Sequence, residues 1–178
     1  ALGFGTFERN KVWLSDISLW EDIYSKNPNS IRAMNVLGIS LLNRGEVKRS
    51  IPMLEKCHAM SPTYLPCIVH LGIGDANLKD YNRGLAILKR GFQLDPNYIH
   101  INFHLGVYYK DYVVDYQNAN FHFSRVEDLS SNRFFQATIK KAEMALEVHD
   151  LNGAVNLVNK VLRMDITNGE AWEAMAKV

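Results

Sequence analysis

Long apolar runs are missing from this 178-residue chain. No stretch reaches the roughly 18 apolar residues that a membrane-spanning helix needs. The apolar start, residues 1–5, is too short for a signal peptide and has no basic region before it. The chain also begins without Met, so a piece of a longer protein is one expectation. We therefore expect no direct membrane insertion of this chain, although a tether to a membrane protein stays open.

An excess of charge of one sign is also missing. The chain has 20 Lys and Arg against 19 Asp and Glu, a net charge of +1, and the two signs are interspersed. Proteins that bind DNA or RNA need a concentrated basic surface to meet the phosphate backbone. We therefore expect no nucleic-acid partner.

Cysteine is scarce, with only Cys57 and Cys67, and no CxxC pair occurs. A zinc or redox motif is therefore not supported. Small buried cysteines are common in protein cores, so we interpret both as core residues. A disulfide between them is the alternative, and the sequence alone does not decide between the two or fix the redox compartment.

Motifs of catalysis are absent as well. No P-loop, GxSxG, HExxH or kinase motif occurs. Gly72-Ile73-Gly74 follows no strand pattern, and Glu127 and Asp128 are adjacent, so a helix would point them in different directions. We expect no enzyme, no catalytic residue and no cofactor.

A regular spacing of landmark residues is present instead. Three prolines, Pro28, Pro62 and Pro96, follow one another at intervals of 34 residues. Three glycines, each preceded by Leu, keep the same interval: Gly38, Gly72 and Gly106. Two unrelated landmarks at one period indicate an internal repeat.

With this period and the Leu-Gly pairs, the sequence resembles the tetratricopeptide repeat (TPR) family, whose repeat is a 34-residue helical hairpin. The resemblance implies an all-α fold, a right-handed TPR superhelix (α-solenoid) of about four helical hairpins with a half-unit at each end. We expect a single TPR domain over residues 1–178: an N-terminal segment and capping helix at 1–30, TPR units at 31–64, 65–98 and 99–131, a divergent unit at 132–168, and the start of a further repeat helix at 169–178. The third unit fits only with an inserted residue near 111–116.

The N-terminal segment carries a second resemblance. Arg9, Asn10, Trp13, Leu19 and Trp20 are similar to the entry into the TPR tails of multi-spanning glycosyltransferase-like membrane proteins. This resemblance implies a membrane-anchored protein and an extracytoplasmic domain, periplasmic or membrane-associated, which we favour over a cytoplasmic one. The alternative is an ordinary capping helix whose tryptophans cover the first hairpin.

The TPR resemblance also implies a concave groove lined by the first helix of each hairpin. Its positions are held here by Arg32, Asn35, Asn43, Tyr64, His70, Asn77, Tyr98, Phe103, His104 and Lys110. Such a mixture of amides, imidazoles, aromatics and cations suits a bound peptide, although each residue alone could simply pack. Asn35 and Ile39 stand where the family's carboxylate clamp begins, so a C-terminal carboxylate ligand is disfavoured.

His70 and His104 occupy the same repeat position and raise the question of a metal. Zinc sites normally use three or four ligands, and no third ligand is evident, so we expect no metal.

Two functions of different class remain. The first is a protein–protein interaction scaffold that binds a peptide or protein segment in the groove. The second is an extracytoplasmic accessory domain of a membrane-bound glycan-modifying enzyme or of a transport or assembly system. Self-association through the incomplete unit near Trp172, giving a homo-oligomer, is a further alternative.

Overall fold

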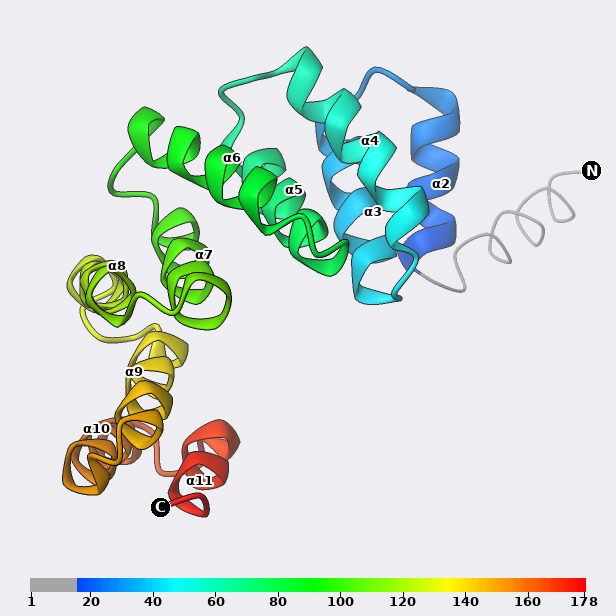
Figure 1. The fold of residues 1–178 in the computed structure, drawn as a ribbon. Coiled ribbons are helices and arrows are strands. Elements are labelled where there is room, and N and C mark those ends of the chain that lie inside the picture. Colours follow the sequence, from blue (N-terminus) through cyan, green and yellow to red (C-terminus); the bar gives the residue numbers. More distant parts are fainter. Residues whose placement is uncertain (1–15) are drawn as a thin grey trace, which may run out of the picture. The chain divides into compact units, whose positions relative to one another are not determined.

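The computed structural model describes residues 16–178, and these contain ten α-helices, one π-helix and no strand. In chain order (Figure 1) they are α2 (Asp16–Lys26), α3 (Ile31–Asn43), α4 (Val47–Met60), α5 (Leu65–Asn77), α6 (Tyr81–Leu94), α7 (Ile99–Tyr108), the π-helix η1 (Tyr109–Val113), α8 (Tyr116–Leu129), α9 (Phe135–Glu147), α10 (Leu151–Met164) and α11 (Gly169–Met175). We call α3, α5, α7, α9 and α11 the first helices, and α4, α6, α8 and α10 the second helices.

The chain divides into two compact units, unit 1 from Ala1 to Ile87 and unit 2 from Leu88 to Val178, with the boundary inside α6. In unit 1, helices α2 to α5 pack in chain order, and α3 also contacts α5. In unit 2, helices α7 to α11 pack in chain order, and α9 also contacts α11. In both units a first helix therefore meets the next first helix as well as the helices adjacent to it in the chain.

Glycines in the first helices allow the second helices to approach closely. A Cβ added at Gly38 would lie 2.5 Å from the Leu54 side chain of α4, and one at Gly106 would lie 2.5 Å from the Phe123 ring of α8. Both neighbouring side chains are fully buried. Close packing thus offsets the roughly 1 kcal/mol that a helical glycine costs relative to alanine.

The turns inside the hairpins use the left-handed conformation. Gly45 has a φ of 77°, and Lys79 and His149 stand in the corresponding turns at 63° and 60°. After α3 the Glu46 amide donates to the Leu41 carbonyl at 2.9 Å, which closes the helix end in the manner of a Schellman motif. The third hairpin differs, because η1 extends α7 there and Val114 follows it with a φ of 58°. The inserted residue of this repeat is accommodated by a π-helix, whose wider turn takes up extra chain.

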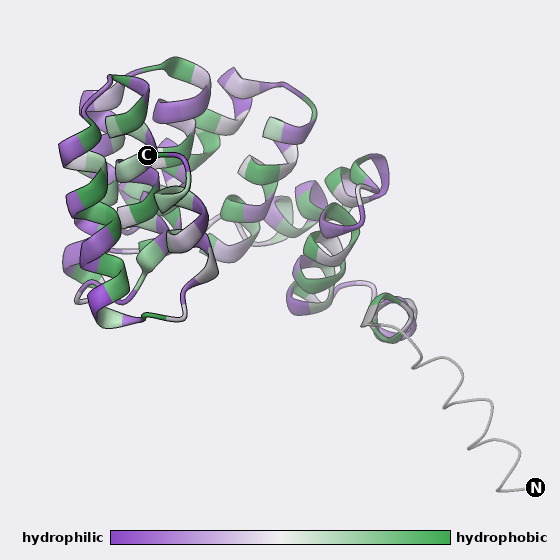
Figure 2. Cartoon of the chain, turned by 90° about the horizontal axis from the view of Figure 1, so that it is seen from below, coloured by the Kyte–Doolittle hydropathy of each residue, from purple (hydrophilic) through white to green (hydrophobic). Residues whose placement is uncertain are grey.

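Apolar side chains gather where the helices of each unit meet. Figure 2 shows hydrophobic and hydrophilic residues alternating around the helices, the amphipathic pattern of elements packed on one face. In unit 1 one such cluster comprises Leu42, Ile51, Leu54 and Leu71. In unit 2 the clusters are Ala119, Phe123, Val126, Ala137 and Met144, and a second one around Ala142, Val158 and Ala171.

The two cysteines are fully buried and joined as a disulfide. Cys57 lies on α4 and Cys67 on α5, with a Cα–Cα distance of 6.2 Å, within the usual range for such a bridge. Burial in the core agrees with the sequence, but the interpretation as unpaired core residues is corrected here, and the disulfide is the alternative that the structure selects. The sequence could not decide this, because pairing depends on how α4 and α5 are juxtaposed.

Helix α2, the first of the described helices, packs against α3. Trp20 packs against a cluster of Ile17, Leu37 and Leu41. Leu19 of the membrane-protein resemblance also lies on α2, whereas Arg9, Asn10 and Trp13 lie outside the described residues. Among residues 16–178 no helix combines the length and apolarity that a membrane crossing requires.

Candidate functional site

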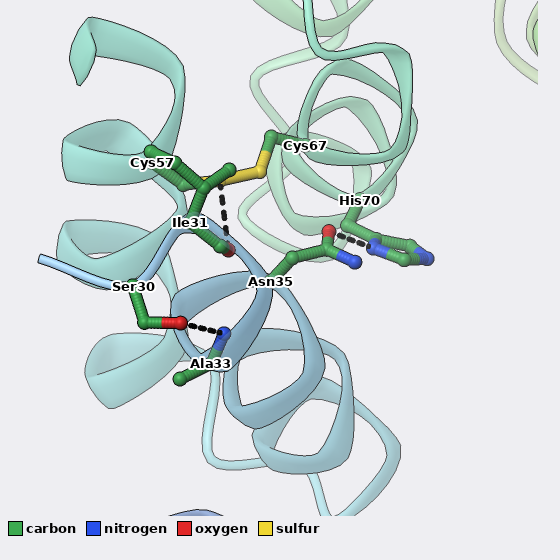
Figure 3. The surroundings of a disulfide bond; sticks show 7 residues. All are labelled: Ser30, Ile31, Ala33, Asn35, Cys57, Cys67 and His70. Atoms are coloured by element: carbon green, nitrogen blue, oxygen red, sulfur yellow. Dashed lines mark hydrogen bonds between the residues drawn. A yellow bond between two sulfur atoms is a disulfide. The ribbon is translucent and has the colours of Figure 1, made fainter. Parts of the chain in front are cut away.

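In unit 1, two of the predicted groove residues meet. Asn35 of α3 is 7% exposed, and its Oδ1 lies 2.7 Å from His70 Nδ1 of α5 (Figure 3). A carboxamide oxygen accepts hydrogen bonds, so the imidazole donates from Nδ1. Cys67, which is bonded to α4, lies one helical turn from His70 on the same helix. The two side chains therefore hold α5 to its neighbours, by a covalent bond on one side and a hydrogen bond on the other.

The other predicted residues of unit 1 are more exposed. Arg32, Asn43 and Asn77 are exposed, and Tyr64 is half-buried at the start of α5. Asn43 lines a cavity of about 220 Å³ together with Ile17, Ser40 and Arg44. Unit 1 thus presents an amide-rich surface, but the Asn35 side chain is buried and hydrogen-bonded to His70.

In unit 2, two adjoining cavities follow α9. The first, about 210 Å³, is lined by Phe103 of α7, by Gln136, Ile139, Lys140 and Glu143 of α9, and by Glu170, Glu173, Ala174 and Lys177 in and after α11. The second, about 350 Å³, is lined by Glu143, Leu146, Glu147 and Lys177. Glu143 and Lys177 belong to both, so we treat the two cavities as one surface and call it the α9 groove. Its lining comes from first helices and from Lys177, which closely follows the last of them.

Only one residue of this cavity lining, Phe103, is among the predicted site residues. The lining residues that were not predicted nevertheless occupy equivalent positions in successive repeats. Phe103, Ile139 and Glu173 each stand three residues before the small residue at the repeat's glycine position, which is Gly106, Ala142 or Ala176. Glu143 and Lys177 each stand one residue after it. Extending the count from the clear repeats to the divergent fourth unit and the partial fifth would have found them.

Lys110 is the predicted residue whose environment is most constrained. It is only 7% exposed, and its Nζ donates to Asp111 and Glu147 at 2.8 Å each and lies 3.5 Å from Glu143. Burial by itself would lower the pKa of this ammonium, but its hydrogen bonds to Asp111 and Glu147 outweigh burial and raise the pKa above its ordinary value. Tyr116 also donates to Glu147, at 2.5 Å. Lys110 therefore ties η1 to α9 behind the groove and is not an exposed cation for a ligand.

The aromatic side chains at α7 pack on one another and on Phe134, which directly precedes α9. The Phe103 ring lies 5.0 Å from that of Phe134 and 5.3 Å from that of His104, centroid to centroid. Tyr98 directly precedes α7, with its ring 5.7 Å from His100. Phe103 is thus a half-buried aromatic wall of the groove, packed against its aromatic neighbours.

A second buried ionic cluster lies between α8, α9 and α10. Glu127 is 6% exposed and accepts from Lys141 at 2.7 Å, from Lys160 at 3.0 Å and from Thr138 at 2.6 Å. Both carboxylate oxygens have partners, so this cluster binds the three helices to one another. Among residues 16–178 no three His, Cys, Asp or Glu side chains converge in a way that could hold a metal ion.

Comparison with known proteins adds information on the fold. No protein-family model matches the chain, and no curated protein matches it in sequence. Solved structures do match. The TPR protein TTC0263 of Thermus thermophilus has a TM-score of 0.84 and 18% identity over 99% of this chain and 95% of its own. The type IV pilus biogenesis factor PilW has a TM-score of 0.72 and 17% identity over 88% of this chain and 72% of its own.

A structure of MamA is also similar, with a TM-score of 0.65 and 17% identity over 90% of this chain and 87% of MamA. At these identities a likeness establishes the fold and not the activity. The prediction of an all-α α-solenoid is confirmed: the described residues form TPR-type helical hairpins.

Proposed function

We propose that this chain is a protein–protein interaction scaffold whose first helices bind a peptide or protein segment. One observation carries the proposal: the two adjoining cavities of unit 2 are lined by successive first helices and by Lys177 after α11, with an aromatic wall, apolar patches and charged rims. Binding sites for peptides commonly combine such an apolar floor with a few placed polar groups. The proposal assigns recognition and no reaction to the groove.

The test places a photo-reactive amino acid at one of two exposed positions in unit 2. Gln136 lines the α9 groove, whereas Asn156 is exposed on the second helix α10 and lines neither of its cavities. We expect a partner segment to cross-link at position 136 and not at position 156 in extracts of the native cells. Equal labelling at both positions, or labelling at 156 alone, would contradict binding by the first helices.

The accessory role outside the cytoplasm is the second candidate, and the disulfide is the observation that favours it. Disulfides persist in oxidising compartments and are rare in reducing cytosol. The Cys57–Cys67 bridge is fully buried and joins two consecutive hairpins, so it is part of the core of unit 1. We propose that the chain resides in an oxidising compartment, where it would position a partner for a membrane-bound glycan-modifying enzyme or a transport or assembly system.

The compartment can be tested by quenching intact cells with acid and then alkylating free thiols in denaturant, because a reagent cannot reach the two fully buried positions in the folded chain. The proposal expects the native chain to carry no alkyl group on Cys57 or Cys67 until it is reduced. Two alkyl groups on the freshly trapped chain would place it in a reducing compartment. Self-association near Trp172, whose side chain is 49% exposed, stays a prediction that a concentration-dependent mass would support.

A further inference from the structure

From the charge and lining of the α9 groove we infer that it selects a segment carrying an arginine or lysine. The basic side chain would enter the first cavity, with its aliphatic stem along Ile139, Ala174 and Phe103 and its cationic end between Glu170 and Glu173. The inference rests on the proposed function and adds to it the chemical class of the partner.

The charge of the groove differs from that of the whole chain. The residues lining its two cavities include four carboxylates, Glu143, Glu147, Glu170 and Glu173, and two ammonium groups, Lys140 and Lys177. The lining is therefore negative by two charges, whereas the chain as a whole is +1. A negative concave surface attracts basic segments and repels acidic ones.

The four carboxylates are not equivalent. Glu143 is engaged by Lys140 at 2.8 Å, and Glu147 accepts from Lys110 at 2.8 Å. Glu170 and Glu173 are both exposed on α11, and in the described part of the chain they have no ion pair with a lysine or arginine. They stand three residues apart on one helix, a spacing that puts both on the same face. These two carboxylates are the ones available to a cation from outside.

The apolar part of the cavity selects the shape of that cation. Arginine and lysine carry long aliphatic stems that pack on apolar surface while the charged end stays near polar groups. Ile139 is 5% exposed and Ala174 3% exposed, so they form a floor, and the Phe103 ring lines the cavity beside it. A guanidinium over the face of an aromatic ring and beside two carboxylates gains from both contacts.

The dimensions suit a short extended segment. The groove follows α9 from Gln136 to Glu147, eleven residues along the helix. At 1.5 Å per residue this is about 16 Å, a length that about five residues of extended chain would span. The segment would place one basic residue in the first cavity and apolar residues toward Leu146 in the second.

The experiment selects random heptapeptides displayed on phage against the 178-residue chain and against the double variant Glu170→Gln/Glu173→Gln. One selected peptide is then synthesised with arginine and with citrulline, its neutral isostere, at the enriched position. We expect arginine or lysine to be enriched on the wild type. The arginine peptide should bind at least about tenfold more tightly than the citrulline peptide, and the double variant should remove this difference. Asp128→Asn, a neutralised exposed carboxylate on α8 outside the groove, is the matched control and should change affinity less than about twofold.

Three results would overturn the inference. If peptides without a basic residue still cross-link to position 136, the inference of a basic side chain is wrong and the proposed function still holds. Basic peptides that bind the double variant as tightly as the wild type would overturn the inference as well. If no selected peptide labels position 136, both the inference and the proposed function are wrong.

Discussion

Reduction of the Cys57–Cys67 disulfide should lower the stability of unit 1 by an amount that follows from the size of the loop it closes. The two cysteines are 10 residues apart in sequence, so the bridge closes a short loop. Restricting a loop of about 11 residues in the unfolded chain removes about 9 cal/mol/K of entropy, or about 2.8 kcal/mol at about 25 °C. Both side chains are fully buried, so the reduced thiols stay packed and add little further change.

Hydrogen exchange measures this change separately in each unit. After reduction, the slowest amides of α4 and α5 should exchange about a hundredfold faster, which corresponds to about 2.8 kcal/mol. Amides of α9 and α10 should change far less, because repeats transmit stability mainly to their neighbours. The variant Cys57→Ala/Cys67→Ala should not respond to the reductant.

Two results would refute this reasoning. If the untreated chain already reacts with thiol reagents at two cysteines, the bridge does not form. If reduction accelerates exchange equally in α4 and in α10, its effect is not the local closure of a loop.

The other predictions concern single residues and are measured by chemical denaturation. Lys110→Met should lower the free energy of unfolding by about 3 kcal/mol, because it leaves partly buried carboxylates without their cation. Adding Glu147→Gln should restore part of this loss. An unchanged free energy in Lys110→Met would mean that water solvates the carboxylates. Burial raises the pKa of Asp75 from 3.8 to about 6, against the opposing effect of Arg83, so the folded state holds this proton more tightly than the unfolded state. The free energy of unfolding should then fall by up to about 3 kcal/mol as the pH rises from about 4 to about 6. Asp75→Asn should remove this fall. A variant with the same pH profile as the wild type would contradict the role of Asp75. Val114→Gly should raise the free energy of unfolding by about 0.5–1 kcal/mol, because a β-branched residue is strained at a φ of 58° and Val114 is 65% exposed. A lower free energy of unfolding in the variant would show that contacts of the valine outweigh the strain.

Much of the fold could be predicted from the sequence because its repeat leaves marks at fixed positions. The prolines and the Leu-Gly pairs recur every 34 residues, and Gly38 and Gly106 lie where a neighbouring helix packs closely. The division into units at 31–64, 65–98, 99–131 and 132–168 stays a prediction. The fourth unit was harder to place because Ala142 replaces the glycine that marks the others.

The candidate site was predicted less well, since it depends on the environment of each side chain. Lys110 was expected to line a groove, yet three carboxylates surround it in the folded chain. Asn35 was expected to meet a ligand, yet it accepts a hydrogen bond from His70. His70 and Glu147 both lie more than thirty residues from the side chains they bind, so periodicity alone does not reveal these pairs.

The sequence by itself determined the repeat, the hairpins and the side of each hairpin from which binding residues are proposed to come. These follow from local physics: the spacing of apolar residues, the helix-stopping prolines and the small residues that permit close helix packing. Only the tertiary structure decided that Cys57 and Cys67 are bonded, that Lys110 is paired with carboxylates and that Glu170 and Glu173 line a cavity beside Phe103. Each of these depends on which side chains from different helices come within a few ångströms of one another. Ion pairs and disulfides form only at such short distances, and the repeat pattern does not specify them.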